Sequence, residues 1–219
     1  MKNNIFLAVL LAVCGHYGQA AEAPSDPQIG SLPDRIEYSK VFTYPAPQVD
    51  AAATPEEKAL LDFRAQFPRV AKLEVTKAGD IRKEQQSFTN GTKKELWKAG
   101  DFGYIVDPAA PERIMVISPQ MNEESETLLT GNGAIFQELS WVKRETFQGE
   151  APRKGVNCDV YKSGDKQVWV DQTSRLPVYF ESPEMQISYA YKPSDVALQL
   201  PERFLKKREE VERAWRGQR

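Results

Sequence analysis

The sequence predicts an α+β fold that is mainly antiparallel β, and three observations carry this prediction. Short segments in which apolar and polar residues alternate recur along most of the chain after Pro68. Turn signals such as Asn90-Gly91 separate them, since asparagine and glycine accept the positive φ of a tight hairpin. Helical patterns are confined to three places, residues 54–67, 134–142 and 201–215. Strands joined by such short turns pair as antiparallel neighbours.

The N-terminus has the pattern of a removable secretory signal peptide. Lys2 precedes an apolar run at residues 5–13, and three alanines follow between residues 20 and 23, where we expect cleavage. A membrane-spanning helix needs roughly 20 apolar residues, so the run is too short to remain as an anchor. We therefore expect an exported protein, periplasmic or secreted, without a transmembrane helix. The alternative is a lipoprotein that is acylated at Cys14.

Removing residues 1–20 also removes the only histidine, His16. The remaining chain cannot form a Ser-His-Asp triad, a Cys-His pair or a histidine zinc site. It keeps 28 basic and 31 acidic residues, so it has no excess of positive charge that would attract nucleic acid. Cys158 becomes the only thiol, so no internal disulfide can form. Its alternating surroundings predict a buried, inert thiol, and a reactive or intermolecular cysteine is the alternative.

Residues 21–53 are rich in proline and show no sustained period, which predicts an extended, poorly ordered arm. Residues 54–219 are expected to form a single domain. Its first helix begins at Thr54, with Pro55 at the first helical position and acids in the first turn, and it ends at Pro68.

Ten strands are expected after this helix, and the last of them is the clearest. Its residues Met185, Ile187, Tyr189 and Tyr191 alternate with polar or small neighbours, which indicates that one face of the sheet is apolar and packed. The expected strands are residues 71–76, 81–88, 93–98, 102–106, 113–118, 144–148, 156–162, 167–171, 176–181 and 185–191.

Two further helices are expected. Residues 134–142 carry apolar side chains at helical spacing, although strand pairing could override this pattern. Residues 201–215 form a charged helix, with Phe204, Val211 and Trp215 on one apolar seam. The charged side is read as a solvated face, and a tail that binds nucleic acid or a partner is the alternative.

Two short motifs could carry chemistry. Thr130-Gly131-Asn132-Gly133 precedes the expected helix at Ala134 and could hold an anion, but it lacks the lysine and spacing of a phosphate loop, so we interpret it as a turn. Glu123, Glu124 and Glu126 are crowded together without the pattern of a calcium loop, which indicates a solvated charge run. Paired glycosidase carboxylates could still meet from distant strands.

Aromatic residues are the remaining candidates for a binding site, because their rings suit both a core and the wall of a lipid pocket. No catalytic residue, metal ligand or cofactor is expected. The candidate wall residues are Trp97, Phe102, Tyr104, Phe136, Trp141, Trp169, Tyr179 and Tyr189.

The segment Val168-Trp169-Val170-Asp171, followed by a turn and Leu176-Pro177-Val178, resembles a strand-turn-strand signature of the periplasmic lipoprotein carriers LolA and LolB. The order of the elements, a signal peptide followed by a helix and serial strands, is also similar. The resemblance covers residues 54–215. The resemblance implies a half-open, incomplete antiparallel β-barrel covered by helices, whose apolar cavity holds acyl chains. The proline-rich arm and the charged terminal helix depart from the carrier pattern.

Three functions are open on this basis. The first is a non-enzymatic, exported protein that binds a lipid or the acyl chain of a lipoprotein in an apolar groove, because burial of apolar surface needs no catalytic residue. The second is an interaction or structural protein of the cell envelope with a filled core. The third is a carboxylate-dependent glycan hydrolase.

Overall fold

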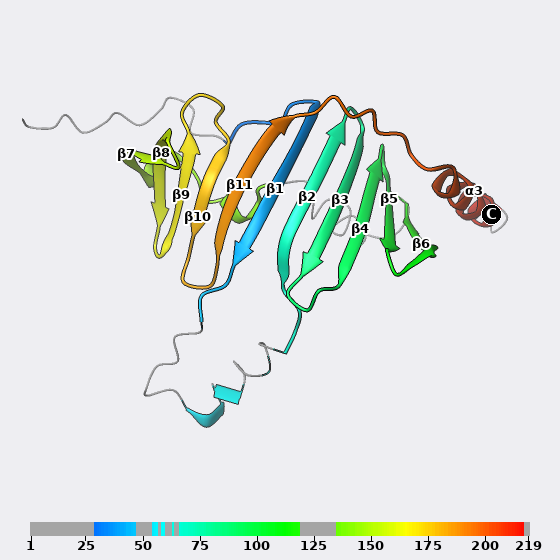
Figure 1. Ribbon diagram of the computed structural model, residues 1–219, viewed down its shortest axis with the longest axis horizontal. Coiled ribbons are helices and arrows are strands. Elements are labelled where there is room, and N and C mark those ends of the chain that lie inside the picture. The colour runs from blue at the N-terminus through cyan, green and yellow to red at the C-terminus, as the bar shows by residue number, and fades with distance from the viewer. Residues whose placement is uncertain are drawn as a thin grey trace, which may run out of the picture.

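Eleven strands form one open antiparallel sheet, in the order β6-β5-β4-β3-β2-β1-β11-β10-β9-β8-β7 (Figure 1). The computed structural model describes residues 29–46, 54–56, 58–59, 63, 66–118 and 135–216, with side chains as far as residue 214. The strands are β1 (Arg35–Thr43), β2 (Val70–Ala78), β3 (Ile81–Phe88), β4 (Lys93–Ala99), β5 (Phe102–Asp107), β6 (Ala110–Ile117), β7 (Phe147–Arg153), β8 (Val156–Ser163), β9 (Lys166–Asp171), β10 (Pro177–Glu181) and β11 (Gln186–Pro193).

The ten strands expected from the sequence are confirmed, most of them to within a few residues. The β3–β4 hairpin turns at Asn90-Gly91, where Gly91 has φ +82° and the Asn90 side chain accepts a hydrogen bond from the Thr92 amide at 3.1 Å. The largest shift is in β7, because Arg144–Thr146 forms a 3₁₀ turn, η2, and the strand begins only at Phe147.

The eleventh strand, β1, was not expected. Residues 21–53 were predicted to be a poorly ordered arm outside the domain, and this is wrong for Arg35–Thr43. β1 pairs with β11 on one side and β2 on the other, so it joins the two halves of the sheet. Alternate residues Ile36, Tyr38 and Lys40 are buried, but Lys40 is charged, so the apolar alternation in the sequence stops after Tyr38.

The helix expected at residues 134–142 is replaced by a single 3₁₀ turn, η1 (Gln137–Leu139). Phe136 before it has φ −120° and ψ 50°, so the backbone does not enter the turn as a helix. The Ile135 carbonyl oxygen accepts a hydrogen bond from Lys40 Nζ of β1 at 2.5 Å, so this segment is bonded to the sheet. The terminal helix is confirmed as α3 (Glu202–Arg216), with Phe204 fully buried.

Other sequence predictions fall largely or wholly outside the described residues. At the expected first helix, Thr54 accepts a hydrogen bond from the Lys58 amide at 3.1 Å, as a helical turn requires, but much of the segment is not described. The signal peptide with Cys14, the glycine motif 130–133 and the acidic run 123–126 are not described at all.

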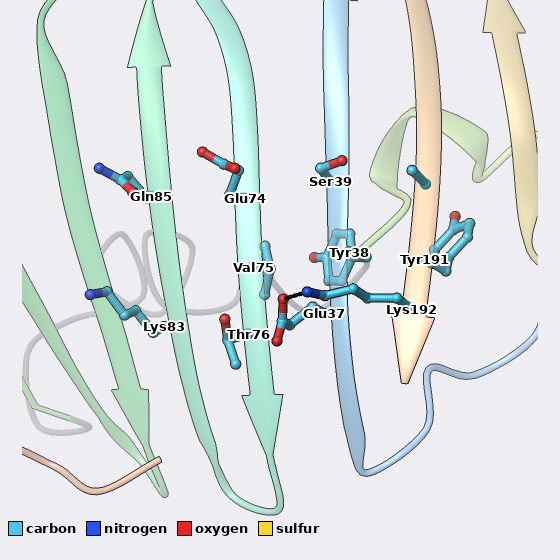
Figure 2. Close-up of a pocket in the computed structure, with 11 residues that line it drawn as sticks. Glu37, Tyr38, Ser39, Glu74, Val75, Thr76, Lys83, Gln85, Tyr191 and Lys192 are labelled. Atoms are coloured by element: carbon cyan, nitrogen blue, oxygen red, sulfur yellow. Dashed lines mark ion pairs between the residues drawn. The ribbon is translucent and has the colours of Figure 1, made fainter. Parts of the chain in front are cut away.

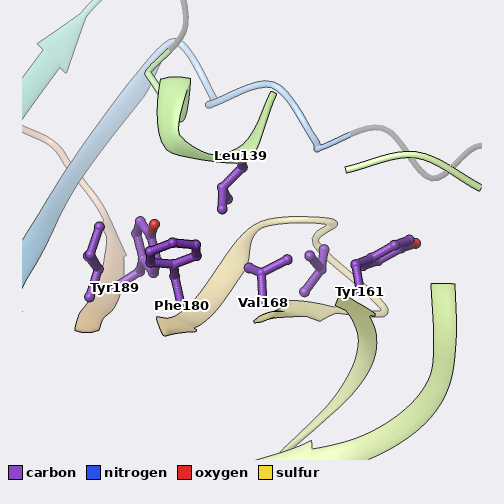
Figure 3. Packing of buried hydrophobic residues seen from close by; sticks show 7 residues of the cluster. Leu139, Tyr161, Val168, Phe180 and Tyr189 are labelled. Atoms are coloured by element: carbon purple, nitrogen blue, oxygen red, sulfur yellow. The ribbon is translucent and has the colours of Figure 1, made fainter. Parts of the chain in front are cut away.

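The two faces of the sheet are covered by different segments, at opposite ends of the sheet. We call the face that carries Tyr38 and Tyr189 the Tyr38 face. We call the face that carries Trp97 and Trp169 the Trp97 face. Cross-strand partners share a face, and the paired registers fix these assignments. Over β8–β11 the Tyr38 face is covered by η1, whose Leu139 packs on the buried apolar cluster shown in Figure 3. Over β4–β6 the Trp97 face is covered by α3.

Candidate functional site

A row of side chains crosses the Tyr38 face from β1 to β6. The register pairs Tyr38 with Val75, Val75 with Glu84, Glu84 with Leu96, Leu96 with Ile105, and Ile105 with Met115. Five of these six side chains are largely hydrocarbon. The row therefore forms a band perpendicular to the strands and about five strand spacings long, or roughly 24 Å.

The far half of this row is left uncovered by the described residues. Tyr38 and Val75 are packed in a buried cluster with Leu32 and Leu176. Leu96 and Ile105 are half-buried and belong to none of the buried clusters, and Met115 is 60% exposed. The described part of the chain thus buries one end of the band and leaves the other open, although the side chains at both ends are largely hydrocarbon.

The polar break in the row is a buried ion pair. Arg82 Nη2 lies 2.8 Å from Glu84 Oε1, and the two side chains are 13% and 7% exposed. In the part of the chain that the structure describes, the Arg82 Nε has no hydrogen-bond partner, although buried N–H groups are almost always paired. Burial, and then the nearby Glu84 carboxylate, raise the pKa of Tyr38. The row therefore includes a charged group, Glu84, paired with Arg82, and a neutral phenol, Tyr38.

The Trp97 face is hollowed over the centre of the sheet, between β11 and β3 (Figure 2). The hollow has a volume of about 530 Å³ and lies over the middle of strands β11, β1, β2 and β3. The side chains of this face that line it are Glu37, Ser39, Glu74, Thr76, Lys83, Gln85, Ala190 and Lys192.

The charges of this hollow are already neutralised. Glu37 Oε2 lies 2.7 Å from Lys192 Nζ, Glu74 lies 2.7 Å from Lys72, and Lys83 lies 3.0 Å from Glu95. The Lys192 hydrogen bond is the main reason that the pKa of Glu37 is lowered. A glycosidase general acid needs a raised pKa, so this carboxylate does not favour the hydrolase reading.

Three of the predicted wall residues lie under α3 on the Trp97 face. Trp97 and Tyr104 pack against Phe204, with ring centroids 5.7 and 5.0 Å away. Phe102 lies beneath the guanidinium of Arg208, 4.0 Å from its ring centroid. These rings hold the helix and do not line an open site.

The other five predicted wall residues form two groups. Phe136, Trp141 and Tyr189 surround η1 on the Tyr38 face, where the Trp141 Nε1 donates to the Glu138 backbone oxygen at 2.8 Å. Trp169 and Tyr179 lie on the Trp97 face of β9 and β10, with centroids 5.6 Å apart. The eight aromatic residues are thus divided between both faces and do not form one wall.

Cys158 is fully buried beside Trp169, and burial raises the pKa of its thiol. The prediction of a buried cysteine is therefore confirmed. A raised pKa lowers the thiolate fraction, which is the nucleophilic form.

Sequence reasoning missed Leu96, Ile105, Met115 and the Arg82–Glu84 pair. The alternation of apolar and polar residues in the expected strands 93–98 and 102–106 could have identified Leu96 and Ile105 as members of one sheet face. Only the register aligns them into one row, and the register depends on turn lengths and bulges, such as the shift between Val106 and Asp107.

No protein-family model matches the chain, and no curated protein is significantly similar to it. Within the described ranges, no helix is both long enough and apolar enough to cross a membrane. The same residues contain no cluster of three or more histidine, cysteine or acidic side chains placed to hold a metal ion.

Proposed function

We propose that the protein is an exported, non-enzymatic binding protein that takes the acyl chain of a lipid or lipoprotein on the Tyr38 face of β3–β6. The observation that carries the proposal is the half of the cross-strand row that the described residues leave uncovered, Leu96, Ile105 and Met115. An apolar band that is left exposed on a protein surface usually has a binding role.

The dimensions of the row suit a hydrocarbon chain. Leu96, Ile105 and Met115 lie on three adjacent strands, which are each about 4.8 Å apart, so they span roughly 10 Å. Each buried methylene would contribute about 0.8 kcal/mol to binding, so eight to ten methylenes would contribute about 6–8 kcal/mol before the cost of association, and a head-group contact must add to this for micromolar affinity. No reacting group is required.

The buried ion pair supports an amphipathic ligand rather than a plain hydrocarbon. Arg82 and Glu84 lie at the inner end of the uncovered row, and among the described residues the buried Arg82 Nε has no hydrogen-bond partner. An acyl carbonyl or carboxylate at this position would satisfy it while the chain extends toward Met115.

We also propose that the open sheet is a flattened relative of the half-open barrel implied by the resemblance to the lipoprotein carriers. An eleven-stranded antiparallel sheet with cover at opposite ends supports this. A fold does not fix a function, so the acyl-chain proposal depends on the row itself.

A second candidate, an envelope interaction protein with a filled core, is favoured by a specific observation. All four buried clusters are packed by the protein's own side chains. Under this alternative the uncovered row would contact an apolar surface of another protein and would take no free lipid.

The test is palmitate binding by isothermal titration calorimetry, with the wild type and two variants, Ile105→Glu and Met115→Glu. A carboxylate placed in the row must be desolvated when the chain binds, so we expect each variant to weaken binding by at least about tenfold. Met115 is exposed on the edge strand, so its variant keeps the fold even if Ile105→Glu does not.

Gln85→Glu is the matched control, because it adds the same charge on the opposite face of the sheet and should leave palmitate affinity unchanged. Absence of palmitate binding by the wild type would favour the interaction protein instead. Equal weakening by all three substitutions would show that net charge, and not the row, sets the affinity.

A further inference from the structure

At the other end of the sheet, an arginine is held on two aromatic rings. The Arg153 guanidinium carbon lies 4.6 Å from the centroid of the Trp169 ring and 4.1 Å from that of Tyr179. The two rings are 5.6 Å apart and tilted by 56°. Trp169 is only 8% exposed and packs on Cys158 and Val160, so the platform beneath the guanidinium is fixed by the core.

Among the described residues this arginine has no acidic partner, in contrast to three other cations held in buried surroundings. Arg82 is paired with Glu84, Arg175 with Asp159 and Lys40 with Glu138. Within the described part of the chain, no carboxylate lies at ion-pair distance from Arg153, whose guanidinium contacts the two rings instead.

The carboxylate that shares this face with Cys158 is already engaged. Asp171 accepts hydrogen bonds from the Thr173 amide at 2.9 Å and from the Ser174 hydroxyl at 2.7 Å. Stacking uses the face of the guanidinium and leaves the N–H donors at its edge free. Arg153 is therefore oriented, charged and unneutralised.

A second cation lies over one of these two rings, Tyr179. The β7–β8 hairpin closes through Lys154-Gly155, and the left-handed Lys154, with φ +53°, places its Nζ 5.7 Å from the Tyr179 centroid. Positive φ is required by a two-residue hairpin turn, where asparagine or glycine is the usual first residue. The turn thus brings two positive charges over the Tyr179 ring.

We propose that Arg153 and Lys154 form a phosphate-binding site on the Trp97 face of β7–β10. A phosphate monoester carries between one and a half and two negative charges at neutral pH, roughly matching the two cations, whereas a carboxylate carries one. The edge of the guanidinium can bind two phosphate oxygens at once. This site is on the opposite face from the proposed acyl-chain row, so either can fail without the other.

The test follows the Trp169 indole N–H signal by NMR during titration with inorganic phosphate. We expect a saturable shift in the wild type, a loss of affinity of at least about tenfold in Arg153→Gln, and intermediate affinity in Arg153→Lys, which keeps the charge but loses the two-point geometry. Lys154→Gln should also weaken binding. Lys166→Gln removes a charge from the neighbouring hairpin on the opposite face and should have no effect.

Sedimentation with phosphatidic acid vesicles, and with phosphatidylcholine vesicles as the control, distinguishes a lipid headgroup from free phosphate. Arg153-dependent binding of either inorganic phosphate or phosphatidic acid vesicles supports the site. The proposal is overturned if phosphate causes no saturable shift, if Arg153→Gln binds as the wild type does, or if acetate binds as tightly as phosphate. Because Arg153→Lys keeps the cover over Trp169, it reports on binding even if Arg153→Gln does not fold.

Discussion

Replacing Lys40 by methionine is expected to lower the free energy of unfolding by about 3–5 kcal/mol. Lys40 Nζ lies 2.8 Å from Glu138 Oε1 and donates to the Ile135 carbonyl oxygen at 2.5 Å. The two charged side chains are 6% and 15% exposed, and Tyr189 donates its hydroxyl to the same Glu138 oxygen at 2.7 Å. Methionine fills similar space but leaves the carboxylate buried without its counter-charge.

Urea unfolding followed by circular dichroism measures this loss. The double variant Lys40→Met/Glu138→Gln should recover most of the stability, because the neutral amide can still accept the Tyr189 hydrogen bond. Lys72→Met is the matched control, since it breaks the exposed Lys72–Glu74 pair on the opposite face and should cost less than about 1 kcal/mol. If Lys72→Met lowered the free energy of unfolding as much as Lys40→Met, the buried Lys40–Glu138 pair would not be what holds η1 on the sheet.

Phe204→Ala is expected to lower the free energy of unfolding by a similar amount, about 3–5 kcal/mol. Phe204 is fully buried, stacked on Tyr104 with an interplanar angle of 10° and edge-on to Trp97. It is the main apolar link between α3 and the Trp97 face, so alanine both opens a cavity and loosens the helix.

The same urea measurement checks this prediction, with Leu205→Ala as the control. Leu205 is the next residue of the helix but is 44% exposed, so its truncation should cost much less. Equal losses in the two variants would mean that helix propensity, and not packing on the sheet, determines the stability of α3.

The strands after Pro68 could be predicted from the sequence because each carries its own alternation and its own turn signal. β1 could not. Its period is interrupted at Lys40, which occupies a core position that reads as polar. The residue that makes this burial tolerable is Glu138, 98 positions later, and no local pattern reveals such a partner. The same contact holds η1 on the sheet where a helix was expected.

The alternation also predicted an apolar face without showing that the two halves of the sheet bury opposite faces. Trp97, Tyr104 and Val106 alternate as regularly as Ile187 and Tyr189 do, yet they point to the other side. Which side is chosen depends on where η1 and α3 pack, and this is a property of the whole topology. The candidate row was missed for the same reason.

The acyl-chain proposal is tested most directly by locating a bound chain on the protein. A spin-labelled stearate added to the protein broadens the NMR signals of methyl groups near it. We predict broadening of the methyl signals of Leu96, Ile105 and Met115, with Val160 on the opposite face unaffected. Broadening confined to residues outside the row, or none at saturating stearate, would contradict the proposal.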